Sequence, residues 1–193
     1  MAHVVVGVSG ASGAPLAHKA IALITSLGYT VDLVMTKHAF LTAIEEMGKE
    51  FGTPEKYIQS FPEQVRLALK VHALHDFTAS IASGTYPTLG MLIIPCSMAS
   101  LAAIACGLSD NLLRRAADVT LKERRRLVIV PREAPLSEIH LENMLKLSRM
   151  GVVFVPPMPA WYMRPQTVSD IEDFIVARSV EALGIQVDYP RWM

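Results

Sequence analysis

Short apolar segments of strand length alternate with segments of helical spacing along the whole chain. The predicted strands are residues 4–8, 30–35, 90–95, 126–130 and 151–155. Continuous β-branched and aliphatic runs of this length are typical of strands that are buried on both faces of a sheet. Their alternation with helices implies parallel strands joined by right-handed crossovers, with helices on both faces. We therefore predict an α/β fold, a Rossmann-like or flavodoxin-like three-layer sandwich with a parallel sheet.

Segments of helical spacing separate the predicted strands. The predicted helices are residues 16–27, 37–47, an alanine-rich stretch after Ser100, 111–122, 137–149 and 169–183. Ser109 or Asp110 is expected to cap the fourth of these helices and Ser169 the last. Residues 50–64 are interrupted by glycine and proline and show no clear pattern. Because domains contain ~100–200 residues, the chain length predicts a single domain over residues 1–193.

The composition excludes several classes of protein. Hydrophobic residues make up 51% of the chain and charged residues 19%, and 18 Lys and Arg balance 18 Asp and Glu. Such a chain can form a core, and its zero net charge gives no general attraction to nucleic acid. Its apolar character favours buried contacts between subunits. No apolar run approaches the ~20 residues that cross a bilayer, and no signal-peptide pattern is present, so no membrane span is expected.

Cysteine usage points to a reducing compartment. Cys96 and Cys106 are the only cysteines, and they form no CxxC pair. A disulfide framework is therefore excluded, and a cytoplasmic location is expected. The six histidines form no ligand-spaced set with these cysteines, so no metal site is predicted.

Small and polar residues follow the predicted strands. The turns are residues 9–13, 36–37, 96–100, 132–133 and 159–162. Because ligands of open parallel sheets bind beyond the carboxyl ends of the strands, these turns are expected to line one site.

The first turn, residues 7–13 (GVSGASG), resembles a turn that holds a phosphate. It is not GxGxxG, a P-loop or a nucleophile elbow, and a tight packing turn is the alternative interpretation. Residues 97–100 begin a second helix, where an ordinary N-cap is the alternative. Two neighbouring helix N-termini favour a ligand with a phosphate and a polar ring edge, such as FMN.

The charged residues in the second half of the chain each allow a structural and a functional interpretation. The basic residues at 114–115 and 122–126 suggest a solvated or intersubunit face, because acidic residues dilute them and aromatics are not interleaved. Arg115 and Lys122 are two helical turns apart and could contact an anion together. Glu133 is a candidate for acid–base chemistry, with an ion pair to Arg132 or Arg164 as the alternative. Glu46 could equally be a solvated helix residue.

Six segments carry a more specific signal. They are residues 10–13 (GASG), 95–97 (PCS), the arginine-rich 110–125, 131–135 (PREAP), 139–144 (IHLENM) and 159–162 (PAWY). Together they resemble the flavin prenyltransferases (the UbiX family), within the wider group of homo-oligomeric flavin-containing Cys decarboxylase-like proteins. The resemblance covers nearly the whole chain.

The resemblance implies a reaction that the residue spacing does not give. A dimethylallyl group would pass from dimethylallyl phosphate to reduced FMN, first to N5 and then to C6, without a metal. The prenylated FMN would then serve a UbiD-type decarboxylase. The resemblance also implies a homododecamer in which neighbouring chains complete each site.

Site residues follow from the matching positions. FMN is expected to contact Gly10, Ala11, Ser12, Gly13, Thr36, Ser97, Met98, Ala99, Ser100 and Arg132. The allyl phosphate is expected to contact Arg115, Lys122, Tyr162 and Arg178, with Glu46 close by and Trp192 closing the site. Glu133, Ser12, Lys122 and Glu46 are the implied catalytic residues, with Glu133 handling a proton and Ser12 placing a hydroxyl near N5. Three departures from the family pattern, at Thr36, Phe77 and Trp161, concern the shape of the donor pocket.

Two other functions remain open. An FMN-dependent decarboxylase of cysteine derivatives would need an active histidine, for which only His18 and His38 are nearby, and both are expected on helix surfaces. A non-catalytic FMN-binding protein would bind the flavin without consuming an allyl phosphate. Arg115, Lys122 and Arg178 favour a phosphorylated co-substrate over both.

Overall fold

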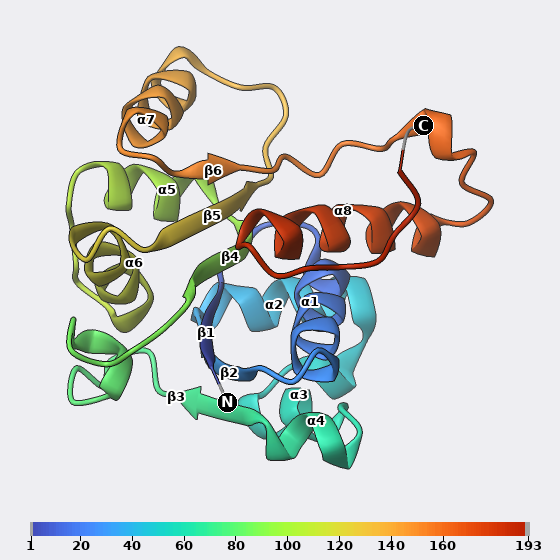
Figure 1. Ribbon diagram of the computed structural model, residues 1–193, viewed down its shortest axis with the longest axis horizontal. Coiled ribbons are helices and arrows are strands. Elements are labelled where there is room, and N and C mark those ends of the chain that lie inside the picture. Colours follow the sequence, from blue (N-terminus) through green and yellow to red (C-terminus); the bar gives the residue numbers. More distant parts are fainter. Residues whose placement is uncertain (1, 192–193) are drawn as a thin grey trace.

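A computed structural model describes residues 2–191 of the chain (Figure 1). Its sheet has six parallel strands in the order β3-β2-β1-β4-β5-β6. The strands are β1 (His3–Val8), β2 (Thr30–Met35), β3 (Leu69–His72), β4 (Gly90–Cys96), β5 (Arg126–Pro131) and β6 (Val153–Phe154). This is the order of Rossmann-like doubly wound sheets. The predicted α/β fold with a parallel sheet is confirmed.

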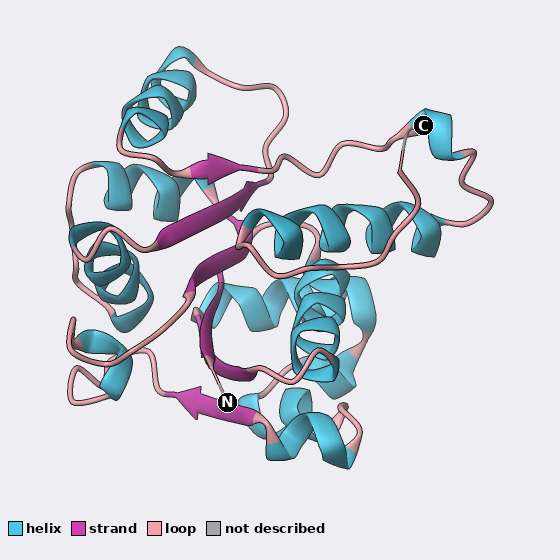
Figure 2. Cartoon of the chain, viewed as in Figure 1, coloured by secondary structure: helices cyan, strands magenta, loops and turns pink. Residues whose placement is uncertain are grey.

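Helices cover both faces of the sheet (Figure 2). The helices are α1 (Ala14–Ser26), α2 (Lys37–Met47), α3 (Pro54–Gln59), α4 (Glu63–Leu67), α5 (Met98–Ala105), α6 (Leu112–Lys122), α7 (Glu138–Arg149) and α8 (Val168–Ala182), with 3-10 turns η1 (Lys49–Phe51), η2 (Ser80–Ala82) and η3 (Trp161–Met163). One core lies between the sheet and α1, α3, α4 and α8, and the other between the sheet and α5, α6 and α7. Among residues 2–191, no helix has the length and apolar character to cross a bilayer.

The apolar composition of the central strands reflects their burial on both faces of the sheet. Val4, Val6 and Val8 face the α1–α8 core, whereas Val5 faces the α5–α6 core. Because both faces are covered, successive side chains of a central strand are all buried, and the sequence shows a continuous apolar run instead of an alternating one.

Most predicted elements have their expected bounds, and the differences have local causes. Asn111 caps α6 in place of Ser109 or Asp110, because its side chain accepts a hydrogen bond from the Arg114 amide at 3.1 Å. Thr167 caps α8 in place of Ser169: its hydroxyl accepts from the Asp170 amide, and the Thr167 amide donates in return to the Asp170 carboxylate, which completes a capping box.

The stretch without a clear pattern forms α3 and α4 around an aromatic cluster. Tyr57 and Phe61 are buried there, and the ring of His18 stacks on Phe61 at a centroid distance of 4.0 Å. Nε2 of His18 lies 3.1 Å from the Ser60 hydroxyl, and burial lowers the pKa of the imidazole. The expectation that His18 lies on a helix surface is wrong, since this ring packs between helices.

Candidate active site

The turns after β1 and β4 are bonded to each other at the carboxyl edge of the sheet. Ser9 is buried, and its hydroxyl accepts a hydrogen bond from the Ser97 amide at 2.7 Å while donating to the Pro95 carbonyl at 3.3 Å. The chain leaves β1 into α1 on one face and β4 into α5 on the other. This is the switch point of the sheet, where doubly wound proteins bind their ligands.

Two glycines let the first turn take its path. A Cβ on Gly10 would lie 2.3 Å from the Cβ of His38, so a side chain would push the turn away from α2. Gly13 has a φ of 111°, a conformation that other residues adopt only with strain. The GASG sequence therefore brings bare backbone to the edge of the sheet.

Glu46 at the end of α2 reaches the start of α1. Its carboxylate accepts hydrogen bonds from the Gly13 amide at 2.9 Å and from the Ala14 amide at 2.7 Å. The interpretation of Glu46 as a merely solvated residue is wrong, because it supplies the cap that Gly13 cannot. An acidic side chain is also favourable at this positive end of the helix dipole.

Hydroxyl side chains start the two helices that flank the switch point. Thr36 caps α2 by accepting from the Ala39 amide at 3.3 Å. Ser97 caps α5 by accepting from the Ser100 amide at 3.3 Å, and Ser100 is buried beside it. The amides of the first turn of α5 point beyond the sheet, as in other helix N-termini that bind anions.

Arg132 and Glu133 follow β5 at the same edge. The Arg132 amide donates to the Cys96 carbonyl at 3.1 Å, which fixes this turn beside the end of β4. Both side chains are exposed and line a cavity of about 240 Å³ together with Met98 and residues 156–158. Glu133 forms no ion pair with another described residue, and its carboxylate accepts from the Ala134 amide at 3.1 Å. The ion-pair alternative for Glu133 is therefore wrong.

Cys96 lies among these groups without being reactive. Its side chain is buried, and burial raises the pKa of the thiol to about 12. Since the thiolate is the nucleophilic form, Cys96 acts as a packing residue. Across residues 2–191, no three side chains of metal-binding type lie close enough together to hold a metal ion.

Arg115 and Lys122 lie away from this edge in a single chain. Lys122 ends α6, and β5 begins four residues later, so Lys122 lies at the amino edge of the sheet. It pairs with Glu123, next to Gly84. Arg115 donates to the Ala82 carbonyl at 3.1 Å and pairs with Asp118 at 2.8 Å. Both cations therefore lie against the segment 80–88 and not against the switch point.

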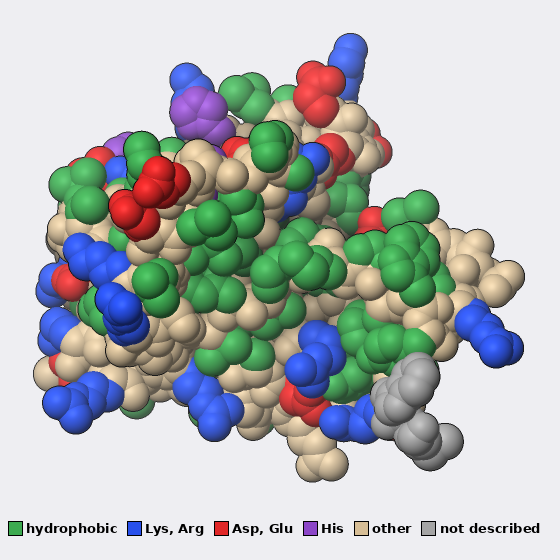
Figure 3. All heavy atoms as spheres, turned by 90° about the horizontal axis from the view of Figure 1, so that it is seen from above, with side chains coloured by type: hydrophobic (Ala, Val, Ile, Leu, Met, Phe, Trp, Pro, Cys, Tyr) green, Lys and Arg blue, Asp and Glu red, His purple; other side chains and the backbone are tan. Residues whose placement is uncertain are grey.

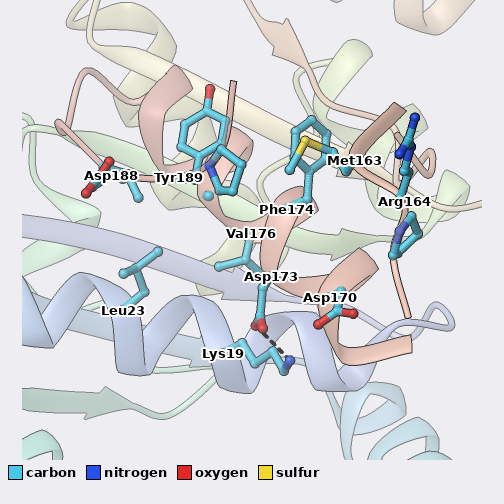
Figure 4. A pocket seen from close by; sticks show the side chains of 14 residues that line it. Lys19, Leu23, Met163, Arg164, Asp170, Asp173, Phe174, Val176, Asp188 and Tyr189 are labelled. Atoms are coloured by element: carbon cyan, nitrogen blue, oxygen red, sulfur yellow. Dashed lines mark hydrogen bonds and ion pairs between the residues drawn. The ribbon is translucent and has the colours of Figure 1, made fainter. Parts of the chain in front are cut away.

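Tyr162 and Arg178 belong to a third region. Tyr162 lies in η3, and its ring meets Phe174 of α8 edge-on at 6.1 Å. Phe174 and Tyr189 line a cavity of about 480 Å³ between α1, α8 and the C-terminal segment, with Lys19 and Asp173 bonded across its floor (Figure 4). Trp192, which was expected to close the site, lies outside the described residues.

The structure thus brings together the residues predicted to contact FMN but separates the residues predicted to contact the allyl phosphate. Residues 10–13, Thr36, residues 97–100, Arg132, Glu133 and Glu46 share the carboxyl edge, whereas Lys122 does not. Sequence reasoning missed the bonds that Ser9 and Glu46 make, because their partners are 88 and 33 residues away. It also missed Glu181 and Tyr189, although Glu181 is three residues from Arg178 and such spacing predicts a contact on a helix.

An open parallel sheet with two helix N-termini at its switch point is typical of nucleotide-binding proteins, and the sequence profile named Flavoprotein matches residues 1–180. The chain is 47% identical over 188 residues to the flavin prenyltransferase UbiX of Halalkalibacterium halodurans, covering 97% of this chain and 91% of that protein. The chain belongs to the UbiX family of flavin prenyltransferases.

Two solved structures share the whole fold. The dodecameric FMN-dependent UbiX-like decarboxylase of Escherichia coli O157:H7 superposes with a TM-score of 0.86 at 45% identity, covering 99% of both chains. AnUbiX (PadA1), solved in complex with FMN and dimethylallyl pyrophosphate, has a TM-score of 0.84 at 39% identity, covering 100% of this chain and 99% of that one.

Proposed function

We propose that this chain transfers a dimethylallyl group from dimethylallyl phosphate to N5 and C6 of reduced FMN and so makes prenylated FMN for a UbiD-type decarboxylase. The observation that carries the proposal is the Ser9 link, which sets the GASG turn and the start of α5 side by side at the carboxyl edge. Family membership indicates the class of reaction, and the carboxyl edge of the sheet is where we place the flavin.

The residues at this edge fit FMN. The cradle that we propose for FMN is the GASG turn together with the start of α5. Gly10 lets this turn lie against α2, since a Cβ there would be 2.3 Å from the Cβ of His38. Among the described residues, no side chain or carbonyl accepts from the Ser12 hydroxyl, which suits it to a flavin ring atom. Thr36, residues 97–100 and Arg132 supply hydroxyls, helix amides and a guanidinium for the polar edge and the phosphate. When bound in its reduced form, FMN would supply the electron-rich N5 and C6, which bond to two different carbons of the dimethylallyl group.

Cationic side chains would stabilise the departing phosphate. Breaking the C–O bond places negative charge on the phosphate, and preorganised positive charge is usually the largest catalytic contribution in such a step. Arg115, Lys122 and Arg178 are the candidates, with Tyr162 beside them. Because these residues lie in separate regions of one chain, we place them around the flavin edge of a neighbouring copy.

Glu133 is positioned to accept a proton. After the carbon–nitrogen bond to N5 has formed, the proton of flavin C6 must leave when the carbon–carbon bond to C6 forms, and an exposed carboxylate at the sheet edge can take it. Glu46, fixed on the Gly13 and Ala14 amides, would hold its negative charge beside the same cradle. Ser12 would orient the reacting edge of the ring.

Assembly into a homododecamer fits the exposed surface. Large hydrophobic side chains lie exposed on α7 and on the segment after β6, notably Ile139, Met158, Trp161 and Val168, which are 67–73% exposed. Figure 3 shows hydrophobic side chains gathered across the middle of the face that carries these elements. Exposure on this scale marks contact surfaces. The free thiols of Cys96 and Cys106 are consistent with the cytoplasmic location that we propose.

The decarboxylase alternative has weaker support. Its only nearby histidines are His18, whose ring is stacked on Phe61, and His38, whose Cβ closes the cradle at Gly10. Among residues 2–191, no carboxylate bonds to either ring to tune it for proton transfer. A phosphorylated donor remains the better fit to Arg115, Lys122 and Arg178.

The mass of the flavin tests the proposal directly. The protein is incubated anaerobically with reduced FMN and dimethylallyl phosphate, and in a parallel arm with the diphosphate, and the flavin is then extracted and weighed. We expect one added prenyl unit. An unchanged flavin would favour a non-catalytic binding protein, and CO₂ released from a cysteine derivative would favour the decarboxylase.

A further inference from the structure

Three side chains near the C-terminal end of the chain share the carboxylate of Glu181. Oε2 of Glu181 accepts from Nη1 of Arg178 and, at 2.6 Å, from the Tyr189 hydroxyl. Oε1 of Glu181 accepts from Nη2 of Arg191 at 2.6 Å, and the Arg191 guanidinium lies 4.7 Å from the centre of the Tyr189 ring. Glu181 therefore ties α8 to the segment that follows it.

The cluster uses only one end of the Arg178 guanidinium. Nη1 donates to Glu181 and, at 2.8 Å, to the Tyr189 oxygen. Within residues 2–191, Nε and Nη2 of Arg178 have no acceptor. A guanidinium has five N–H donors, so three remain, and the Nε–Nη2 edge is the one that binds an oxyanion with two parallel bonds.

The balance of charge leaves this edge attractive to an anion. Arg178 and Arg191 share the single carboxylate of Glu181, so the cluster retains one net positive charge. The Tyr189 hydroxyl, followed by the two guanidiniums, lowers the pKa of Glu181, so the carboxylate stays ionised throughout the neutral range.

Aromatic rings connect the Glu181 cluster to Tyr162, which is also predicted to contact the allyl donor. Phe174 meets Tyr162 edge-on at 6.1 Å and Tyr189 at 5.9 Å. Figure 4 shows Phe174 and Tyr189 on the same side of the cavity, above the Lys19–Asp173 pair. Tyr162 and Arg178 are thus placed by one continuous set of packed side chains.

We infer that Glu181 and Tyr189 are positioning residues for the allyl donor: they fix the Nη1 end of Arg178 so that its Nε–Nη2 edge meets the donor phosphate. The inference rests on the proposed function, which makes Arg178 a phosphate contact. Glu181 does not compete with the phosphate, because each uses a different edge of the guanidinium. Its second oxygen holds Arg191 and thereby keeps the C-terminal segment beside the phosphate subsite.

The test compares Glu181→Gln with Glu172→Gln. Glu172 is a matched control, since it lies on α8, is similarly exposed at 22% against 25%, and pairs with Lys19 at 3.1 Å. KM for dimethylallyl phosphate, kcat, FMN affinity and the binding of inorganic phosphate to the FMN-loaded protein are measured. For Glu181→Gln we expect KM and the phosphate dissociation constant to rise about three- to tenfold, with kcat changed less than KM and FMN affinity unchanged. Glu172→Gln should match the parent protein.

A second, smaller substitution ensures that a folding defect in Glu181→Gln is not mistaken for weaker binding of the donor. Tyr189→Phe removes one hydroxyl, and we expect a smaller rise in KM that is not additive with that of Glu181→Gln, since both act through Nη1. An unchanged or lowered KM in Glu181→Gln would overturn the inference, the lowered value because it would make Glu181 a competitor of the phosphate. If the parent protein adds no prenyl unit, the proposed function fails, while weaker phosphate binding by Glu181→Gln would still support the positioning role.

Discussion

The hydroxyl of Ser9 lies 2.7 Å from the amide nitrogen of Ser97, across the two central strands of the sheet. This bond joins the turn that begins α1 to the turn that begins α5. Because the two helices leave on opposite faces, the bond fixes the width of the crevice between them. The proposed flavin cradle therefore depends on a serine that would not itself have to touch the flavin.

Replacing Ser9 with alanine tests this role. The Ser97 amide would lose its buried partner, which costs about 1–3 kcal/mol of unfolding free energy, whereas the Pro95 carbonyl keeps its bond from the Ser9 amide. We expect FMN affinity to fall as the crevice loosens, measured by fluorescence titration alongside urea unfolding. Ser26→Ala, an exposed serine that bonds only within α1, should change neither quantity. Full FMN affinity in Ser9→Ala would contradict the role of this bond.

Glu133→Gln separates flavin binding from proton transfer. The amide fills the same space but cannot accept the C6 proton, so FMN should bind normally while ring closure slows by about 10²-fold or more. Mass spectrometry and absorbance of the flavin during a single turnover measure the rate. Glu63→Gln, on an exposed face of α4, is the control. Prenylated FMN formed at the normal rate would remove Glu133 from the mechanism.

Asp32 makes the stability of the fold depend on pH. It is fully buried on β2, with His3 and His72 each 2.8 Å from one of its oxygens. Burial raises the pKa of this carboxyl, but the hydrogen bonds from His72 and His3 outweigh it and hold the pKa below 3.8. Because the folded pKa lies below the unfolded one, the stabilisation is present above about pH 4 and is lost as the pH falls through the folded value.

Urea unfolding between pH 7 and pH 3 measures that dependence. Asp32→Asn should lower the unfolding free energy at pH 7 by about 3 kcal/mol, since two half-buried histidines lose the buried carboxylate that they contact. The variant should also lose stability less steeply than the parent protein on acidification. Asp188→Asn, an exposed carboxylate in the segment after α8, is the control for general charge effects. Parallel acid profiles for Asp32→Asn and the parent protein would contradict this assignment.

The carboxyl edge of the site could be predicted from sequence because its residues follow strands directly. Once the strands are found, the geometry of parallel sheets places Ser12, Ser97, Arg132 and Glu133 together. The same geometry also places Lys122, since a helix that leads into a strand must end at the amino edge. The separation of Lys122 from the carboxyl edge therefore follows from the order of helix and strand along the chain. A site that contains both Lys122 and the carboxyl-edge residues requires more than one copy of the chain.

Other features could not be predicted because their signals are not local. β3 was missed since Leu69–His72 alternates polar and apolar residues at the edge of the sheet, unlike the continuous apolar runs of the central strands. The bonds of Glu46 and Asp32 join residues that come together only after the sheet forms. The observed caps, Asn111 and Thr167, lie one or two positions from the predicted ones. At each helix start, several side chains could accept a hydrogen bond from the first free amides.

Complementation between two inactive variants tests the shared site most directly. Chains carrying Glu133→Gln and chains carrying Lys122→Ala are unfolded, mixed and refolded, and prenylated FMN is quantified by mass. If one copy supplies Glu133 and another supplies Lys122, random mixing leaves about one site in four intact. The mixture should then close the ring, followed by flavin absorbance, many times faster than either variant alone. A mixture as inactive as its two components would contradict a site built between copies of this flavin prenyltransferase.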